Sequence, residues 1–385
     1  MGIFSRRDKD DDSDAWHNKG NALAKLQRYE EAIECYDEAI RLNPEDFDVW
    51  YNKGSLLEEL QRYEEAIVCY DEAIRLNPED FDVWFNKGNS LDELERYEEA
   101  IGCYDEAIRL DPEDSDTWFN KGNSLDELER DEEAIGCYDE AIRLNPENYI
   151  AWNNKGNSLV KLERHEEAIG CYDEVIRLNP EDSDAWHNKG RSLADLKRHE
   201  EAIECYDEAI RIDPEYYITW HNKGDSLAQL ERYEEAIECY DEAIRIDPEY
   251  YITWHNKGTS LARLERHKEA IECYDEAIRL NPEDFDVWYN KGSSLAQLER
   301  REEAIGCYDK AIRLDPENYI AWFNKGNSLV KLERHEEAIG CYDEVIRLNP
   351  ENYNAWHNKG TSLGKLGRYI EAEKCFAKFK ELNKY

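Results

Sequence analysis

The chain has 385 residues, of which 49 are basic and 90 acidic, so its formal net charge is −41. Binding to nucleic acid depends on Lys and Arg neutralising phosphates, and a chain this acidic without a basic stripe is repelled by phosphates and by anionic membranes. No apolar run approaches the length of about eighteen residues that a spanning helix needs. We therefore expect a cytoplasmic protein that binds neither nucleic acid nor membrane, and whose partners are basic or neutral.

The first segment, residues 1–12, is expected to be a short charged tail. It has no apolar stretch long enough for a secretory signal. The acidic run from Asp8 to Asp14 lacks the glycine and the distal glutamate of an EF-hand loop, so we interpret it as a charged cap before the first helix. From Ser13 onward a single architecture is predicted to continue to Tyr385.

A 34-residue period organises the rest of the chain. A glycine follows each tryptophan after four residues, and the ten prolines keep the same period. A fixed period of this length is typical of solenoid proteins. The tryptophans are Trp16, Trp50, Trp84, Trp118, Trp152, Trp186, Trp220, Trp254, Trp288, Trp322 and Trp356. The eleven predicted units are 13–46, 47–80, 81–114, 115–148, 149–182, 183–216, 217–250, 251–284, 285–318, 319–352 and 353–385.

Each unit is predicted to contain two helices. In the first unit, apolar residues at helical spacing over 16–26 predict one helix, and those over 32–40 predict a second. The polar residues 27–28 separate them. Pro44 ends the second helix, because proline disfavours helical geometry in the residue before it. The acidic residues within 45–48 stand where helix capping and the helix dipole favour carboxylates.

Small residues on the two apolar faces predict close packing within the pair. Gly20 and Ala32 let antiparallel helices approach, while Trp16 and Tyr36 fill the flanking space. A single hairpin would still expose apolar surface, so neighbouring hairpins must stack. We therefore predict an all-α solenoid with a concave and a convex side.

These residues resemble a known repeat signature. The pattern W-x-x-K-G-x-x-L from Trp16, A-x-x-x-Y from Ala32 and then Pro44 is similar to that of the tetratricopeptide repeat (TPR) family. Lys19 and Leu23 replace the usual Leu and Tyr, and both changes recur throughout, which indicates a subfamily variant. The resemblance covers residues 13–385. It implies a right-handed α-solenoid superhelix that acts as a non-enzymatic scaffold and binds peptides and proteins.

The resemblance also implies that the first helix of each unit lines the concave groove. An asparagine stands two residues after every tryptophan there, and its amide offers a donor and an acceptor to an extended peptide backbone. This row resembles the asparagine ladder of the TPR superhelix in O-linked N-acetylglucosamine transferase. The alternative is that each amide bonds its own repeat and fixes the hairpin. The ladder residues are Asn18, Asn52, Asn86, Asn120, Asn154, Asn188, Asn222, Asn256, Asn290, Asn324 and Asn358.

Variable positions on the same face are expected to set specificity. In units two to four, aromatic and acidic side chains alternate, which suggests a site for a basic and partly apolar segment. Alternatively, the aromatic residues pack between units and the charged face is merely solvated. These residues are Tyr51, Phe85, Phe119, Asp48, Asp82, Asp116, Glu58, Glu59, Asp92, Glu93, Asp126 and Glu127. Isoleucine replaces the first-turn Asp in other units, where a less acidic groove is expected: Ile150, Ile218, Ile252 and Ile320.

No motif predicts catalysis, a metal or a cofactor. The eleven cysteines, from Cys35 to Cys375, occur once in every unit at the same position and without any CxxC pair, which favours reduced apolar fillers. The S-x-x-K match at Ser158 has no S-D-N or K-T-G partner in the chain. We therefore expect no enzyme activity.

One further sequence feature bears on partners. The carboxylate clamp of chaperone-binding TPR proteins needs a Lys directly after a Trp and a basic pair in a later unit. Only its asparagines occur here, so binding of acidic chaperone C-termini is not expected.

The block Glu147–Glu181 recurs as Glu317–Glu351 with one change, Asn153 to Phe323. Segmental duplication or a designed origin would each produce it.

A structural or self-associating role is the alternative function. The last predicted helix, Ile370 to Tyr385, is rich in Lys, and Phe379 takes the place of the usual Ala. No further helix follows to cover it, so it is expected to serve as the cap. If its apolar face is poorly covered, ends would stack into homo-oligomers.

Overall fold

A computed structural model describes residues 6–383, with side chains from residue 12 onward. These residues form 22 α-helices and no strand. The first helix begins at Arg6, so it includes residues 6–12, which the sequence analysis placed in a tail and cap. Residues 1–5 of that expected tail lie outside the described residues, as do Lys384 and Tyr385 of the expected last helix.

The helices alternate between a first and a second helix in each repeat. The first helices are α1 (Arg6–Lys25), α3 (Phe47–Glu59), α5 (Phe81–Asp92), α7 (Ser115–Glu127), α9 (Tyr149–Lys161), α11 (Ser183–Asp195), α13 (Tyr217–Gln229), α15 (Tyr251–Arg263), α17 (Phe285–Gln297), α19 (Tyr319–Lys331) and α21 (Tyr353–Lys365). The second helices are α2 (Tyr29–Leu42), α4 (Tyr63–Leu76), α6 (Tyr97–Leu110), α8 (Asp131–Leu144), α10 (His165–Leu178), α12 (His199–Ile212), α14 (Tyr233–Ile246), α16 (His267–Leu280), α18 (Arg301–Leu314), α20 (His335–Leu348) and α22 (Tyr369–Leu382).

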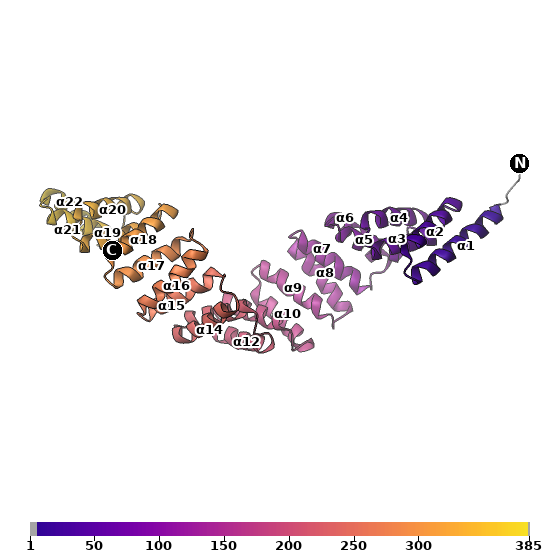
Figure 1. Cartoon of the computed structure of the whole chain (residues 1–385), viewed down its shortest axis with the longest axis horizontal. Helices are drawn as coiled ribbons and strands as arrows, with labels where there is room; N and C mark the ends of the chain where they lie inside the picture. Colours follow the sequence, from indigo (N-terminus) through magenta and orange to yellow (C-terminus); the bar gives the residue numbers. More distant parts are fainter. Residues whose placement is uncertain (1–5, 384–385) are drawn as a thin grey trace. The chain divides into compact units, whose positions relative to one another are not determined.

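The chain divides into two compact units, residues 1–192 and 193–385, and the division falls within α11. In each unit the two helices of a repeat pack on each other, and the second helix packs on the first helix of the next repeat, as α4 does on α5 and α14 on α15 (Figure 1). The predicted all-α solenoid of helix pairs is thereby confirmed.

Consecutive first helices lie close to each other within each unit. In the N-terminal unit α3 contacts α5, and in the C-terminal unit α17 contacts α19. Among the described helices, no two consecutive second helices approach to the same extent. The first helices therefore occupy the inner side of the stack in each unit.

The glycine of each first helix allows the close approach within a pair. A Cβ atom added at Gly20 would lie 2.7 Å from Cε1 of Tyr36, and one at Gly122 would lie 2.7 Å from Cε1 of Tyr138. Real Cβ atoms do not come so close to a carbon atom, so any larger residue would force the tyrosine ring or a helix to shift. Ala32 on the opposing helix is fully buried. The predicted role of the small residues is confirmed.

The lysine that departs from the TPR signature joins neighbouring repeats. Lys121 Nζ lies 5.8 Å from the ring centroid of Trp118 in its own repeat and 2.5 Å from Asp105 Oδ1 in the preceding one. The same ion pair recurs in both units as Lys53–Asp37, Lys87–Asp71, Lys155–Asp139, Lys189–Asp173, Lys223–Asp207, Lys257–Asp241, Lys291–Asp275, Lys325–Asp309 and Lys359–Asp343. An ion pair thus replaces the apolar contact that a leucine would make.

Turns between helices have defined geometry. Gln61 has φ 57°, its N–H donates to Glu58 O, and the Arg62 N–H donates to Leu57 O, both at 2.8 Å. This is a Schellman motif with a non-glycine residue in the left-handed position. Between repeats, the Trp84 Nε1–H donates to Pro78 O at 3.0 Å. The ten tryptophans from Trp50 to Trp356 are each fixed in this way by the proline loop that precedes them.

The carboxylates expected at helix starts act as caps. Asp80 accepts a hydrogen bond from the Val83 N–H, as Asp284 does from Val287. All eleven cysteines are buried and unpaired, and burial raises the pKa of Cys103 to about 11, which confirms their role as apolar fillers. Within residues 6–383, no helix combines the length and apolar character that a membrane crossing requires.

Candidate functional site

Hollows open between consecutive first helices. Two of them, between α13 and α15 and between α17 and α19, share one construction: side chains five, eight and nine residues after the tryptophan of one repeat face those two and five residues after the tryptophan of the next, and a core tyrosine completes the lining. A third lies between α3 and α5 and extends to Asn120 of α7. We call all three inter-repeat hollows. The asparagine row takes part in each.

The asparagine amides tie each first helix to the preceding repeat. Asn154 Nδ2 donates to Asn123 Oδ1 at 3.0 Å, and the hydroxyl of the core Tyr138 donates to the same oxygen at 3.0 Å. Asn123 therefore connects its own core tyrosine with the next repeat. Equivalent networks are Tyr104–Asn89–Asn120 and Tyr342–Asn327–Asn358.

Other ladder asparagines find different acceptors in the preceding repeat. Asn86 and Asn324 donate to the hydroxyls of Tyr51 and Tyr289. Asn52 and Asn290 meet Nε2 of His17 and His255, and Asn256 donates to Asp225. These bonds run to side chains of the preceding repeat, in contrast to the alternative in which each amide bonds its own repeat.

The row is largely half-buried. Asn18, at the start of the row, is exposed, while Asn188 and Asn222 are half-buried like the eight asparagines with the bonds above. Each of these hydrogen bonds occupies only one of the two N–H groups of the asparagine amide. A second N–H and the Oδ1 remain as groups that each of those asparagines can offer to a ligand.

The predicted aromatic residues pack on their own repeats. The ring centroids of Tyr51 and Tyr70 are 6.5 Å apart, and Phe119 lies 6.1 Å from Tyr138. Phe85 makes the same contact with Tyr104, and all three first-helix rings are half-buried. Each ring thus presents only part of its surface. The predicted acidic residues of the first helical turn, which are Asp48, Asp82 and Asp116, are exposed.

Four of the predicted acidic residues meet in one hollow. Glu58, Glu59, Asp92 and Glu93 line a space of about 530 Å³ between α3 and α5, together with Tyr63, Asn89 and Asn120 of the following helix α7. We call this the acidic hollow.

Burial governs the charge state of two of these carboxyls. It raises the pKa of Glu58, which accepts a hydrogen bond from the Tyr70 hydroxyl and is repelled by Glu93. It also raises the pKa of Asp92, against the effect of the hydrogen bond from Ser124. Both carboxyls therefore carry negative charge at a cost that a bound cation would relieve.

The acidic run ends at Asp126. Its carboxylate accepts a hydrogen bond from Ser158 Oγ at 2.7 Å and from Lys161 Nζ at 2.9 Å. Lys161 Nζ also lies 3.6 Å from Asp131 Oδ1. Asp126 is thus neutralised within the fold, whereas its neighbour Glu127 is exposed. Both residues were predicted from the sequence to belong to the acidic site, and the ion pair of Asp126 was not predicted.

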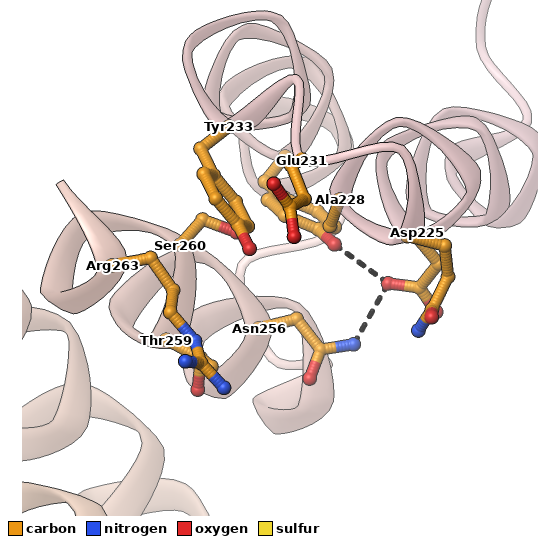
Figure 2. A pocket seen from close by; sticks show the side chains of 10 residues that line it. Asp225, Ala228, Glu231, Tyr233, Asn256, Thr259, Ser260 and Arg263 are labelled. Carbon is orange, nitrogen blue, oxygen red and sulfur yellow. Dashed lines mark hydrogen bonds between the residues drawn. The ribbon is translucent and has the colours of Figure 1, made fainter.

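The hollow between α13 and α15 combines opposite charges. Asn256 Nδ2 donates to Asp225 at 2.8 Å. Figure 2 shows this bond on one side of the pocket and Arg263 on the other, and Glu231 and Tyr233 also line the pocket. Asp225 also accepts from the Tyr240 hydroxyl and lies 3.3 Å from His221 Nε2. Burial raises the pKa of Asp225, but these three hydrogen bonds outweigh it and leave the pKa below its usual value.

The hollow between α17 and α19 contains two cations, Arg301 and Lys331. It has a volume of about 430 Å³ and is also lined by the acidic Glu299 and by Ser293, Gln297, Asn324, Asn327 and Ser328. Of these residues, only Asn324 was predicted from the sequence to belong to the site. A signal was present in the sequence, because Arg301 begins a second helix at a position that Tyr, His or Asp occupies in the other repeats.

The sequence profile described as "Tetratricopeptide repeat" matches the chain at residues 17–81, 68–115, 85–149, 119–170, 153–217, 255–319 and 289–353. Two further profiles with the same description match residues 217–250 and 341–374. Together they cover most of the chain.

Several solved structures are similar to parts of it. YrrB, described as a TPR protein with an unusual peptide-binding site, is 30% identical over 49% of this chain and 97% of its own, with a TM-score of 0.45. MamA from Desulfovibrio magneticus RS-1 is 23% identical over 45% of this chain and 97% of its own (TM-score 0.42). Yeast Tom70 is 17% identical over 98% of this chain and 93% of its own (TM-score 0.41). No curated protein matches the chain.

Proposed function

Because the chain belongs to the tetratricopeptide repeat family of protein-interaction scaffolds, we propose that it is a non-enzymatic scaffold that holds an extended segment of a partner protein along its first helices. The observation that carries this proposal is the row of inter-repeat hollows with an asparagine amide at each. A repeated polar site of this kind suits a repeated polar ligand, and an extended peptide backbone is one.

The spacing of the amides suits such a ligand. Packed helices lie about 10 Å apart, and an extended chain advances about 3.3 Å per residue. One asparagine would therefore meet about every third residue of a bound segment. Where Nδ2 already donates to the preceding repeat, as in Asn120 and Asn154, Oδ1 is the group best placed to accept a peptide N–H.

The acidic hollow favours a basic side chain in that segment. Glu58 and Asp92 are half-buried carboxyls whose pKa values burial raises, with Glu59 and Glu93 beside them. A Lys or Arg placed among them would offset this cost. Tyr63 in the lining offers an aromatic face to the same cation. The partner is accordingly a basic or neutral and partly apolar protein segment.

Fluorescence anisotropy with a labelled peptide of alternating Lys and Leu tests the charge requirement. We expect Glu58→Gln with Asp92→Asn to weaken binding about tenfold, the loss of one charge-assisted contact. Glu64→Gln with Glu132→Gln changes the net charge equally on exposed second-helix positions and is expected to leave binding within about twofold. Equal affinities of the two double variants would refute the acidic site.

The asparagine ladder needs a separate test, because replacing Asn120 or Asn154 also removes a bond between repeats. The change is therefore made on the ligand. A peptide of the same sequence with N-methylated backbone amides cannot donate to Oδ1, and we expect it to bind at least about tenfold more weakly. If both peptides bound equally well, the backbone would not be what the asparagines recognise.

Self-association is the second candidate function, and the surface of α22 supports it. Tyr369 is 69% and Ile370 75% exposed, whereas Tyr63, at the equivalent position of α4, is half-buried and its hydroxyl meets Glu93 of the next repeat. Sedimentation velocity over a hundredfold concentration range tests it. A mass that stays monomeric throughout would rule this candidate out, and suppression of a dimer by Ile370→Glu would support it.

A further inference from the structure

The duplicated block gives the chain two copies of one inter-repeat site with different surroundings. Residues 147–181 and 317–351 differ only at Asn153, which is Phe323 in the second copy. The repeats that precede the two blocks differ more. Asp126 and Asp131 precede the first block, and Ala296 and Arg301 stand at the corresponding positions before the second.

In the first copy, the protein fills the site with its own carboxylates. Lys161 Nζ lies 2.9 Å from Asp126 Oδ2 and 3.6 Å from Asp131 Oδ1. The Asp131 side chain is only 12% exposed. The three side chains sum to one net negative charge. The positive charge of Lys161 is therefore compensated between α7 and α9 without a ligand.

In the second copy, both carboxylates are gone and a second cation is present. Lys331 corresponds to Lys161, and Arg301 takes the place of Asp131 in the lining of the hollow between α17 and α19. The Arg301 side chain is 21% exposed, and the acidic group that it approaches is Glu299, at 3.5 Å, a side chain that is 83% exposed. Solvent screens an ion pair with so exposed a partner strongly. Two positive charges thus line this hollow, beside the exposed carboxylate of Glu299, where the first copy holds one positive charge.

Hydrogen-bond donors accompany these charges. Asn327 Oδ1 is engaged by Tyr342 and Asn358, which leaves Nδ2 as the group that Asn327 offers. Gln297 also lines the hollow. A basic pair together with neutral amide donors is the chemistry that binds an oxyanion.

We propose that the hollow between α17 and α19 binds the carboxylate of an acidic side chain, which occupies the place that Asp126 and Asp131 fill in the first copy. This inference rests on the proposed function, since the acidic side chain belongs to a segment held along the first helices. The site differs from the carboxylate clamp considered above, because its cations come from the end of a first helix and the start of the preceding second helix. One ligand region is therefore acidic, in addition to the basic one expected at the acidic hollow.

The test uses the full chain and two labelled peptides that differ only in carrying Glu or Gln at two central positions. A third peptide carries phosphoserine there, to distinguish a carboxylate from a phosphate as the preferred oxyanion. The key variant is Ala296→Asp with Arg301→Asp, which recreates the first copy. It is expected to fold, because the first copy already holds these carboxylates beside Lys161. The reciprocal variant is Asp126→Ala with Asp131→Arg.

We expect the Glu peptide to bind at least about tenfold more tightly than the Gln peptide. This preference should disappear in Ala296→Asp with Arg301→Asp and increase in the reciprocal variant. A preference that survives in the first variant, or no preference in the wild type, would overturn the inference, and a preference for phosphoserine alone would replace carboxylate by phosphate. Gln-peptide binding in the wild type shows whether a segment is held at all, so failure of this inference and failure of the proposed function can be told apart.

Discussion

Lys121 Nζ lies 2.5 Å from Asp105 Oδ1, so the residue that replaces the usual apolar one of the TPR signature forms an ion pair with the preceding repeat. The lysine is 19% and the aspartate 56% exposed. Partial burial strengthens the attraction, while the exposed aspartate keeps it moderate. The stacking of repeats in this chain thus depends in part on charge.

A double-mutant cycle on this pair tests its contribution. We expect a coupling free energy of about 0.5–1 kcal/mol between Lys121→Ala and Asp105→Ala. Lys121→Ala alone should cost more than Asp105→Ala, because it also removes the contact with the Trp118 ring. Native-state hydrogen exchange of α6 and α7 measures both effects locally. A coupling of zero would mean that the pair does not link the repeats.

Gly122→Ala should destabilise the fourth repeat. The new Cβ atom would lie 2.7 Å from Cε1 of the buried Tyr138. A helix or the ring must therefore shift, at a cost of about 1–3 kcal/mol. Gly136→Ala is the matched control on the second helix of the same repeat, because a Cβ atom there meets no atom within 4 Å. We expect that control to gain about 0.5–1 kcal/mol from helix propensity. Urea unfolding of both variants checks the opposite signs, and a neutral Gly122→Ala would contradict the packing argument.

The acidic hollow should make stability fall as pH rises. Burial raises the pKa of Glu58 and of Asp92 above the ordinary values of 4.5 and 3.8. The folded state therefore binds these protons more tightly than the unfolded state, and stability decreases as pH rises through the raised pKa values. At pH 7, Glu58→Gln with Asp92→Asn should be more stable than the wild type, with the difference shrinking toward pH 4. Thermal unfolding across this range measures it, and a difference independent of pH would contradict the assignment.

The periodicity of tryptophan, glycine and proline was sufficient to predict the helix pairs, and the resemblance to the TPR family implied which helices face the groove. The start of α1 at Arg6 was not predicted, because the charged residues 6–12 have no apolar period, although several of them are compatible with a helix. The left-handed residue Gln61 was also missed. It occupies a position where glycine is the usual signal, and Gly367 is the glycine that stands there, in the last repeat.

Side-chain partners in the site were less predictable, since they depend on the offset between stacked repeats. The acceptor of a ladder asparagine lies 31 or 35 residues earlier in the chain, and its identity changes from Asn123 to Tyr289. Likewise Lys161 reaches Asp126 across 35 residues. A residue that recurs at the same position of every repeat indicates a repeated role. The residues at neighbouring positions decide whether its side chain finds its hydrogen-bond or ion-pair partner within the fold.

The histidines next to the tryptophans illustrate this point and give a further prediction. His187 follows Trp186 directly and is buried, and burial together with the charge of Arg191 lowers its pKa to about 4. A histidine with a depressed pKa contributes stability that is lost as pH falls from its unfolded value of 6.5 toward 4. The loss would reach about 3 kcal/mol at low pH, opposite in sign to the effect of Glu58 and Asp92.

An NMR titration of the imidazole resonances measures the pKa of His187 directly. We expect a midpoint near 4 in the wild type. Arg191→Gln removes the smaller of the two causes, so the midpoint should rise but stay below 6.5, because burial is the larger one. His187→Asn identifies the resonance among the nine histidines. A wild-type midpoint near 6.5 would show that the ring is solvated and able to contact a bound segment.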